Sequence, residues 1–600
     1  MAGSGVRRRK LLGWTGCALA PSVAGGSPAV GFRRVRPGEA GWPAEAEWSA
    51  LDRAVGGRLR RLESPLAACA AAPDGAACAA VRSRLRNPFY LGDEPALTQT
   101  SGWAGAWRSA PSHLAVAARD ASDVVAAVNF ARRHRLRLVV KGGGHSYQGT
   151  SSAPDSLLVW TRAMQDVTLH DGFTAKGCVA PPVPAVSIGA GAMWGRAYDA
   201  VTTRGGRYVQ GGGCTTVGVA GLVQSGGFGS FSKAYGMAAA SLLEAEIVTA
   251  DGTLHVVNDC SEPDLFWALR GGGGGSFGVV ARLTLRTHDL PAWFGGVFGA
   301  IRATSDAAYG RLIARFVSHY REHLFNPHWG EQFAVRPDNT LSIGMTFQGI
   351  DEASAMAAWR PLLDWVAASP SDYVVAEPVR AIALPARRFW DPALLRTLPG
   401  LVLPDDRPGA PKGNLFWAGD AGQVGQFLHG YQSAWLPAAL LTPGQDAALA
   451  EALFEASRHW RISLHTNKGM AGAPASVVAD ARRLPTHPAV ADAFALAISA
   501  AEGPPAFPGQ PGAEPDLRLA RRHASAIAAA MDRLRQVAPE TGSYLAESDY
   551  FTPHWQAAYW GPNYARLLAV KHRYDPEGLF FVHNGVGSEG WSADGFERLP

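Results

Sequence analysis

Hydrophobic residues recur at helical and strand-like spacings in turn between residues 87 and 288. Residues 120–134 predict an amphipathic helix, for which Asp120 or Ser122 is available as the N-cap. Its apolar face consists of Val124, Val125, Val128 and Ala131. The apolar run at residues 136–140 follows directly and predicts a strand.

Further segments of both kinds follow along this part of the chain. We predict strands over residues 157–160, 184–188, 242–249, 253–257 and 279–285, and helices over residues 194–203 and 263–269. Asp251-Gly252 separates two of these strands and is a typical β-hairpin turn. Pro263 stands at the first position of its helix, where proline is tolerated. The mixture predicts an α+β fold.

The second half of the chain alternates between the same two patterns. Residues 306–323 and 353–366 predict helices, and residues 340–347 predict a strand. Proline-rich stretches at residues 404–411 and 503–515 predict loops or insertions. No internal repeat is visible in the sequence.

A first glycine-rich loop, residues 141–149, follows the strand at 136–140. Gly142, Gly143 and Gly144 precede His145 and Ser146 in this loop. Glycines allow backbone N–H groups to approach an anion closely, and successive N–H groups form an anion-binding nest. The loop indicates a phosphate-bearing cofactor, with a simple turn as the alternative.

Two more loops of this kind occur later in the chain. Residues 210–229 contain eight glycines and one cysteine, Cys214, and residues 270–278 contain five consecutive glycines. Neither the first loop nor the second has the GxGxxG pattern of a Rossmann βαβ unit. The five-glycine run predicts backbone packed against a cofactor. A flexible linker is the alternative, which the flanking Phe266, Trp267 and Phe277 disfavour.

These loops resemble those of the berberine-bridge-enzyme-like FAD-linked oxidases, in the vanillyl-alcohol-oxidase (PCMH-type) superfamily. In that family a GGGHSY-like loop supplies a histidine bonded to the flavin 8α-methyl group, and a GGGC loop supplies a cysteine bonded to ring carbon 6. His145 and Cys214 match these positions. Residues 559–581 resemble the family's C-terminal signature. The resemblance implies FAD held covalently through His145 and Cys214.

The resemblance also implies an architecture. A PCMH-type FAD-binding domain of two α/β subdomains is expected at residues 85–290, and a substrate domain with an antiparallel sheet covered by helices at 291–545. Residues 546–600 would return to pack on the FAD domain. Separately from this resemblance, the residue pattern predicts an export signal and linker at residues 1–45 and a helical segment at residues 46–84.

Cofactor contacts are expected throughout the three loops and in the C-terminal signature. The expected residues are Gly142, Gly143, Gly144, His145, Ser146, Gly149, Gly213, Cys214, Val217, Gly218, Gly221, Gly227, Val279, Asn563 and Tyr564.

The chain must also take a proton from the substrate, because flavin supplies only the redox step. Family members use a tyrosine with a carboxylate, or a glutamate on a strand of the substrate domain. The corresponding strand, near residues 494–499, offers no acid. The substitutes are Tyr431, His465, Asp549 and Tyr550, each of which has a purely structural role as its alternative.

The expected activity is oxidation of an alcohol, C–H or amine group of a small-molecule or oligosaccharide substrate, with molecular oxygen reoxidising FAD to give hydrogen peroxide. Val217 matches a family position at the flavin edge where oxygen approaches, and a small branched residue is compatible with oxidase activity. Leu222 stands where many plant members have histidine. A dehydrogenase with another electron acceptor is the alternative, and a flavin-free binding protein is disfavoured because His145 and Cys214 are both present.

Composition limits which classes of protein and of binding partner are expected. Of the 600 residues, 47% are hydrophobic and 18% are charged, which is typical of a globular protein. The net charge is only +5 with scattered basic residues, so no nucleic-acid partner is expected. Nineteen tryptophans fit aromatic-lined clefts as well as a large core. Composition does not indicate an oligomeric state.

The amino terminus has the pattern of an export signal. Arg7, Arg8 and Arg9 precede Leu11-Leu12 and a short apolar run, which suggests the twin-arginine route. The run is shorter than the roughly 20 apolar residues of a membrane span, and no integral membrane segment is expected. The alternative is a basic N-terminal arm.

Six cysteines do not indicate a disulfide scaffold in a chain of this length. Residues 66–81 predict two short helices joined by a turn, and place Cys69 and Cys78 either in a disulfide or as two buried thiols. Cys17, Cys178 and Cys260 lack closely spaced cysteine or histidine partners, so no metal site is expected.

Overall fold

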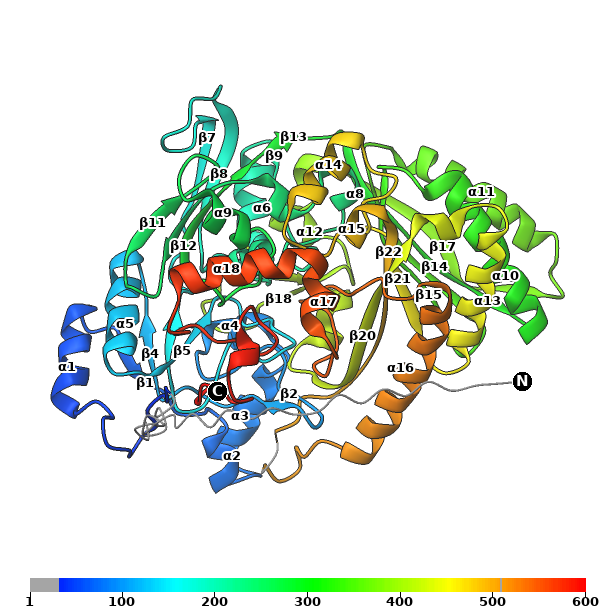
Figure 1. Ribbon diagram of the computed structural model, residues 1–600. Coiled ribbons are helices and arrows are strands. Elements are labelled where there is room, and N and C mark those ends of the chain that lie inside the picture. Colours follow the sequence, from blue (N-terminus) through cyan, green and yellow to red (C-terminus); the bar gives the residue numbers. More distant parts are fainter. Residues whose placement is uncertain (1–31, 508–509) are drawn as a thin grey trace, which may run out of the picture.

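The computed structural model describes residues 32–507 and 510–600 (Figure 1). A four-stranded sheet with the order β1-β4-β6-β5 lies near the amino terminus. Its strands are β1 (Leu59–Arg61), β4 (Leu114–Ala117), β5 (Arg137–Lys141) and β6 (Ser156–Trp160). The last three are mutually parallel, so the chain must cross over between them, and a helix makes one crossover.

That helix is α5 (Ala121–Arg133), which confirms the prediction for residues 120–134. The Asp120 carboxylate accepts hydrogen bonds from the backbone N–H groups of Ser122 and Asp123 and caps the first turn. Val124 and Val128 are buried against the sheet. The helix therefore fixes β5, at whose end the first glycine-rich loop begins.

A second, five-stranded antiparallel sheet has the order β11-β10-β12-β8-β7. Its strands are β7 (Val167–Phe173), β8 (Val183–Gly189), β10 (Leu242–Val248), β11 (Leu254–Val257) and β12 (Val279–Arg286). The predicted hairpin at Asp251-Gly252 is confirmed, since β10 and β11 pair antiparallel across it. Gly252 has φ +80°, a conformation that favours glycine.

The second half of the chain builds a nine-stranded sheet with the order β17-β14-β16-β15-β21-β22-β20-β2-β3. Seven strands come from this half: β14 (Trp293–Ala303), β15 (Trp329–Val335), β16 (Thr340–Gln348), β17 (Tyr373–Pro385), β20 (Phe427–Pro437), β21 (Ile462–His465) and β22 (Ala493–Gly503). They pair antiparallel, as expected for the substrate domain. The other two, β2 (Gly102–Trp103) and β3 (Trp107–Arg108), come from the first half. Strand β2 pairs parallel with β20 and β3 pairs antiparallel with β2, which the sequence pattern did not show.

Four long helices cover one face of this sheet, on the right-hand side of Figure 1. They are α10 (Asp306–His319), α11 (Glu352–Ala367), α13 (Gln445–Ser457) and α16 (Leu517–Val537). Their apolar faces and the sheet form a continuous buried cluster that includes Trp359 and Phe316. The opposite face of the sheet is left to line the cavity described below.

Two predicted helices continue as wider π-helical turns. Residues 194–203 form α6 (Trp194–Tyr198) and η1 (Asp199–Arg204), and residues 306–323 form α10 and η3 (Tyr320–Leu324). An extra residue in a turn leaves the apolar spacing nearly unchanged, so the sequence pattern cannot distinguish the two forms.

The remaining elements are short. They are α1 (Glu45–Ala54), α2 (Ala67–Ala71), α3 (Ala76–Arg84), α4 (Pro88–Asp93), β9 (Arg207–Tyr208), α7 (Val219–Gln224), α8 (Ser232–Tyr235), η2 (Ala238–Ser241), α9 (Pro263–Leu269), β13 (His288–Asp289), η4 (Ala386–Arg388), α12 (Pro392–Leu395), β18 (Val402–Pro404), β19 (Leu415–Trp417), η5 (Ala418–Gln423), η6 (Ala438–Leu441), α14 (Ala475–Arg483), α15 (Ala489–Asp492), α17 (Trp555–Trp560), η7 (Gly561–Asn563), α18 (Tyr564–Tyr574) and η8 (Ser588–Gly590).

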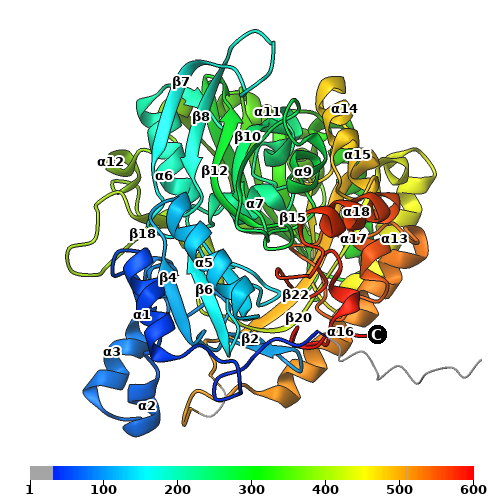
Figure 2. The same cartoon turned by 60° about the vertical axis from the view of Figure 1, so that its left-hand side comes forward.

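The C-terminal segment returns to the first half of the molecule, as predicted (Figure 2). The Trp560 indole Nε1–H donates to the carbonyl of Gly271, and the Lys571 ammonium donates to the carbonyl of Ser276. Both bonds end on the five-glycine loop. Residues of the C-terminal segment therefore fix the position of that loop by hydrogen bonds to its backbone.

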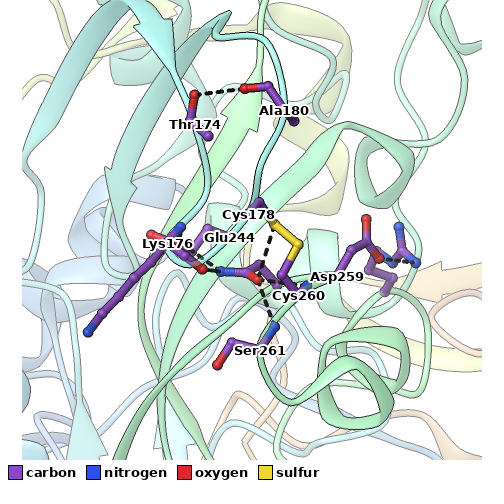
Figure 3. Close-up of a disulfide and its surroundings, with 10 residues drawn as sticks. Thr174, Lys176, Cys178, Ala180, Glu244, Asp259, Cys260 and Ser261 are labelled. Atoms are coloured by element: carbon purple, nitrogen blue, oxygen red, sulfur yellow. Dashed lines mark hydrogen bonds and ion pairs between the residues drawn. A yellow bond between two sulfur atoms is a disulfide. The ribbon is translucent and has the colours of Figure 1, made fainter.

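Two disulfides are present. Cys69 is bonded to Cys78, which decides between the two alternatives for that pair. Cys178 is bonded to Cys260, a pairing that the sequence analysis did not predict (Figure 3). This bond ties the β7–β8 connection to the turn after β11. The two cysteines have a sequence separation of 82, and the antiparallel sheet brings them together.

No helix within residues 32–507 and 510–600 is long and apolar enough to cross a membrane. Arg7, Arg8, Arg9 and the predicted export signal lie outside these residues, as does Cys17.

Candidate active site

A cavity of about 1070 Å³ lies between the glycine-rich loops and the uncovered face of the nine-stranded sheet. All three loops contribute backbone to its wall, and strands β14, β15, β16, β17, β20, β21 and β22 contribute side chains. Its volume is slightly above the usual range for ligand sites, about 300–1,000 Å³. It has room for an extended cofactor and a substrate.

Lys141 anchors the first loop where β5 ends. Its buried ammonium donates hydrogen bonds to the carbonyls of Leu91, Glu94 and Leu97, at 3.2, 2.7 and 2.6 Å. Gly144 has φ +77°, and a Cβ atom there would lie 2.8 Å from Cε of Lys141. The loop can therefore pass over the lysine only if this residue is glycine.

The first two loops are in backbone contact with each other. A Cβ atom on Gly143 would lie 2.8 Å from the backbone nitrogen of Gly218, and the reverse holds for a Cβ atom on Gly218. Gly221, one turn later, faces open space. The contact exposes peptide groups to the cavity, as binding of a phosphate-bearing ligand requires.

The five-glycine loop completes this wall. Gly273 and Gly275 have φ +97° and +79°, and Gly272, Gly273, Gly274 and Gly275 all line the cavity. The loop is therefore part of the cavity wall, in disagreement with the flexible-linker alternative, and its contact with a cofactor stays a prediction.

His145 and Cys214 face the same space. Both line the large cavity and an adjoining recess of about 20 Å³. The Nε2 atom of His145 is hydrogen-bonded to Oγ1 of Thr216 at 3.1 Å, and burial lowers the pKa of His145 to about 4. Burial raises the pKa of the Cys214 thiol, which is not in a disulfide. At neutral pH the site presents a neutral imidazole and a protonated thiol.

Several polar atoms in the cavity wall fit a polar ligand. Buried atoms without a hydrogen-bond partner among the described residues include Oε1 of Gln148, Oγ of Ser276, Nδ1 of His465 and Oδ1 of Asn467. Leaving such atoms unpaired costs about 1–3 kcal/mol each. Together with the peptide groups of the loops, they suit a ligand that has both phosphates and a heterocycle, such as FAD.

Ten of the predicted cofactor residues line the cavity: Gly142, Gly143, Gly144, His145, Ser146, Gly213, Cys214, Val217, Gly218 and Gly221. Five lie outside its wall. Gly149 packs against Trp107, and Gly227 packs against Leu222. Val279 is buried in the core, and its neighbour Val280 lines the cavity instead. Asn563 donates a hydrogen bond to the carbonyl of Thr486, and Tyr564 donates one to the carboxylate of Glu589.

Two of the four predicted proton acceptors line the cavity and two do not. Tyr431 on β20 and His465 on β21 line the cavity. Asp549 and Tyr550 lie outside its wall, because Asp549 accepts a hydrogen bond from Gln432 and Tyr550 stacks on His583 with ring centroids 3.7 Å apart. These contacts give both residues structural partners.

Tyr431 and His465 differ in protonation. Burial raises the pKa of Tyr431 well above its ordinary value, so its phenol keeps its proton. Its ring lies 5.2 Å from that of Tyr147, in the first loop. Burial lowers the pKa of His465, and Lys468 and Arg461 lower it further, so its imidazole is neutral. Of the two, only His465 can accept a proton at neutral pH.

Four carboxylates in the cavity wall were missed by the sequence reasoning: Glu331, Asp420, Glu502 and Glu547. Strand β22 extends to Gly503, so the expectation that this strand offers no acid was wrong: Glu502 lies three residues past the stretch considered. Burial raises the pKa of Glu502 and of Glu331, whereas Glu547 forms an ion pair with Lys468. Correct strand length would have revealed Glu502; the other three depend on tertiary contacts.

Comparison with known proteins agrees with this geometry. Two family models match, one described as "FAD binding domain" over residues 112–258 and one as "Berberine and berberine like" over residues 543–587. The VAO-type flavoprotein oxidase VAO615 of Thermothelomyces thermophilus is 30% identical, over 94% of this chain and 95% of its own.

Solved structures show the same fold. The crystal structure of VAO-type flavoprotein MtVAO615 from Myceliophthora thermophila C1 has a TM-score of 0.76 at 26% identity, and covers 95% of this chain and 100% of that one. Glucooligosaccharide oxidase from Acremonium strictum, described with a 6-S-cysteinyl, 8α-N1-histidyl FAD, has a TM-score of 0.60 at 18% identity and covers 88% and 99%.

Fold and site together define an FAD-dependent oxidoreductase. The chain belongs to the berberine-bridge-enzyme-like FAD-linked oxidases of the VAO type.

Proposed function

We propose that this oxidase holds FAD through two covalent bonds, one to His145 and one to Cys214, and oxidises an alcohol group of a carbohydrate or natural product. Dioxygen would then be reduced to hydrogen peroxide. The proposal depends mainly on one observation: both side chains face one cavity walled by three glycine-rich loops. Bound FAD supplies the acceptor for hydride from the substrate carbon.

Hydrogen bonding supports the attachment at His145. If Nε2–H donates to Thr216, the lone pair of the neutral ring lies on Nδ1 and is available for bond formation. The low pKa keeps this nitrogen unprotonated at neutral pH. The bicovalent flavin described for glucooligosaccharide oxidase, a structure with the same fold, is consistent with this assignment.

We assign the proton transfer to His465 and the orientation of the substrate hydroxyl to Tyr431. The neutral imidazole of His465 has an unpartnered Nδ1 in the cavity wall, which suits a proton acceptor. The phenol of Tyr431 retains its proton and can donate a hydrogen bond to substrate oxygen. Residues on adjoining parts of one sheet hold both groups in fixed positions.

The substrate side of the cavity suits a bulky or extended molecule. Gly295, Gly296 and Gly344 leave strands β14 and β16 without side chains there, and Phe298 and Ile382 are about 45% and 46% exposed beside them. A flat apolar floor of this kind accepts the face of a sugar ring or a polycyclic compound.

Acid precipitation of the purified protein tests the proposal. Wild type should give a yellow pellet, each of His145→Ala and Cys214→Ala should retain flavin through the other bond, and the double variant should release it. Peroxide should form with a panel of alcohols, and His465→Gln should lower kcat by about a hundredfold without releasing flavin. Flavin that stays on the precipitated double variant would refute the two attachment sites.

A further inference from the structure

Residues 401–423 form a strap that crosses from the substrate half of the chain to the loop of Cys214. It consists of the short hairpin β18–β19 and the turn η5. Oγ1 of Thr215 donates to the carbonyl of Leu415 at 2.8 Å, and Nε1 of Trp417 donates to the carbonyl of Gly213 at 3.0 Å. The strap is therefore bonded to the residue on each side of Cys214.

The outer end of the strap is fixed as well. Arg407 pairs with Asp405 within the strap and with Asp93 at the end of α4, and Asp93 also pairs with Arg162. Asn87, the N-cap of α4, donates hydrogen bonds to Asp405 and to Asp406. A segment held at both ends can position a side chain precisely.

The side chain that it positions at the cysteine is Asp420. Asp420 and Cys214 both line the cavity and the recess that also contains His145, and the nearby carboxylate adds to the effect of burial in raising the pKa of the thiol. The other carboxylates that act on Cys214 are Glu331 and Glu547, and Glu547 is paired with Lys468. Of these three carboxylates, only Asp420 lines the small recess together with Cys214.

Bond formation at this cysteine needs a base. Burial keeps the thiol protonated, yet the thiolate is the nucleophile. When Sγ bonds to flavin carbon 6, the thiol proton and the hydrogen on that carbon must both leave. The electron pair of the lost C–H bond remains on the ring as a two-electron reduction, and dioxygen then takes it with both protons as hydrogen peroxide.

From this geometry we infer that Asp420 is the general base for flavin attachment at Cys214: it accepts the thiol proton as the Sγ–C6 bond forms. The inference depends on the bicovalent attachment proposed above. It gives the strap a function in maturation of the enzyme that is separate from substrate oxidation. The attachment at His145 does not involve Asp420.

The test is the state of Cys214 in holoprotein expressed for a fixed time. The protein is denatured, alkylated with iodoacetamide and digested, and mass spectrometry gives the Cys214 peptide as flavinylated or alkylated. We expect Asp420→Asn to lower the flavinylated fraction at least about tenfold, while the His145 peptide stays flavinylated. Asp406→Asn, on the same strap, should match wild type.

Three outcomes distinguish failure of this inference from failure of the proposed function. Asp420→Asn with a fully flavinylated Cys214 would overturn the inference. An alkylated Cys214 in wild type would instead remove the second covalent bond from the proposed function. If Asp420→Asn does not retain FAD, the deciding experiment is Asp420→Ala incubated with sodium formate. Recovery of the Cys214–flavin bond supports a carboxylate base. No recovery in a folded, FAD-bound protein overturns the inference.

Discussion

At the scale of single residues, glycine content alone does not identify the cofactor wall. Gly143 and Gly218 are needed because their backbones touch across two loops, and both face the cavity. Gly149 and Gly227 occur in the same glycine-rich stretches, but their missing side chains make room for Trp107 and Leu222. A glycine next to a cofactor and a glycine next to a side chain look the same in sequence.

Val217 is the residue for which we predict an effect on oxygen. It lines the cavity three residues after Cys214, and it is smaller than leucine by one methylene group. Val217→Leu should slow reoxidation of substrate-reduced enzyme by about tenfold or more, equivalent to about 1.4 kcal/mol of barrier, while sparing flavin reduction. Stopped-flow mixing with oxygenated buffer measures the two steps separately.

Reoxidation of the wild-type enzyme by air and by other electron acceptors distinguishes an oxidase from a dehydrogenase. If its reduced flavin persists for minutes in air but recovers quickly with a quinone or dye, the enzyme is a dehydrogenase and Val217 does not govern an oxidase reaction.

At the scale of elements, the strap shows how a short hairpin depends on distant partners. Residues 404–411 were predicted as a loop, and they form the connection between β18 and β19. Its ion pairs reach Asp93 and, through it, Arg162, which lie more than two hundred residues earlier. Local sequence shows proline and charge here, but not the partners.

The strap should loosen in acid. Burial opposes ionisation of Asp405, but hydrogen bonds from Arg407, Asn414 and Asn87 outweigh it and lower its pKa to about 2. Because the pKa of Asp405 is lower in the folded than in the unfolded chain, its ionised carboxylate stabilises the fold. This contribution is complete above the pKa of the unfolded chain, near 4, and is lost as the pH falls towards 2. The difference in unfolding free energy between wild type and Asp405→Asn should therefore shrink from pH 5 to pH 2 in denaturant titrations. A constant difference would show that Asp405 does not titrate in this range.

The two disulfides should contribute unequally to stability. Cys178–Cys260 closes a loop with a sequence separation of 82, and Cys69–Cys78 one with a separation of 9. Loop-closure entropy predicts a loss of about 4–5 kcal/mol when the first pair is replaced by serines and about 2–3 kcal/mol for the second. Urea unfolding of the two double-serine variants measures both, and the reverse order would contradict the entropic argument.

At the scale of the whole molecule, the site is made where two halves of the chain meet. The glycine-rich loops supply one wall, strands of the nine-stranded sheet supply the other, and the C-terminal helices hold the five-glycine loop in place. Strands β2 and β3 extend the sheet from the first half, so the two halves also share hydrogen bonds. We retain the predicted division at residues 85–290, 291–545 and 546–600 as a proposal.

Export is the prediction that concerns the whole protein. We propose that Arg7, Arg8 and Arg9 direct it through a twin-arginine route, and two disulfides are in keeping with an oxidising compartment. Replacing the three arginines by lysines should retain the protein in the cytoplasm, as measured by fractionation and immunoblotting. A conservative Lys10→Arg variant is the control, and unchanged export of the triple variant would exclude this route.

The sequence by itself determined the elements with strong local signals and the glycine-rich loops that contain His145 and Cys214, the two proposed attachment residues. Helix α5, the β10–β11 hairpin and the loops of His145 and Cys214 follow from spacing, turn chemistry and motif, all of which act over a few residues. Tertiary structure alone decided the Cys178–Cys260 bond, the placement of Asp420 at the thiol, and which of Tyr431, His465, Asp549 and Tyr550 reach the cavity. Those outcomes depend on contacts between residues tens to hundreds of positions apart, which no local pattern encodes.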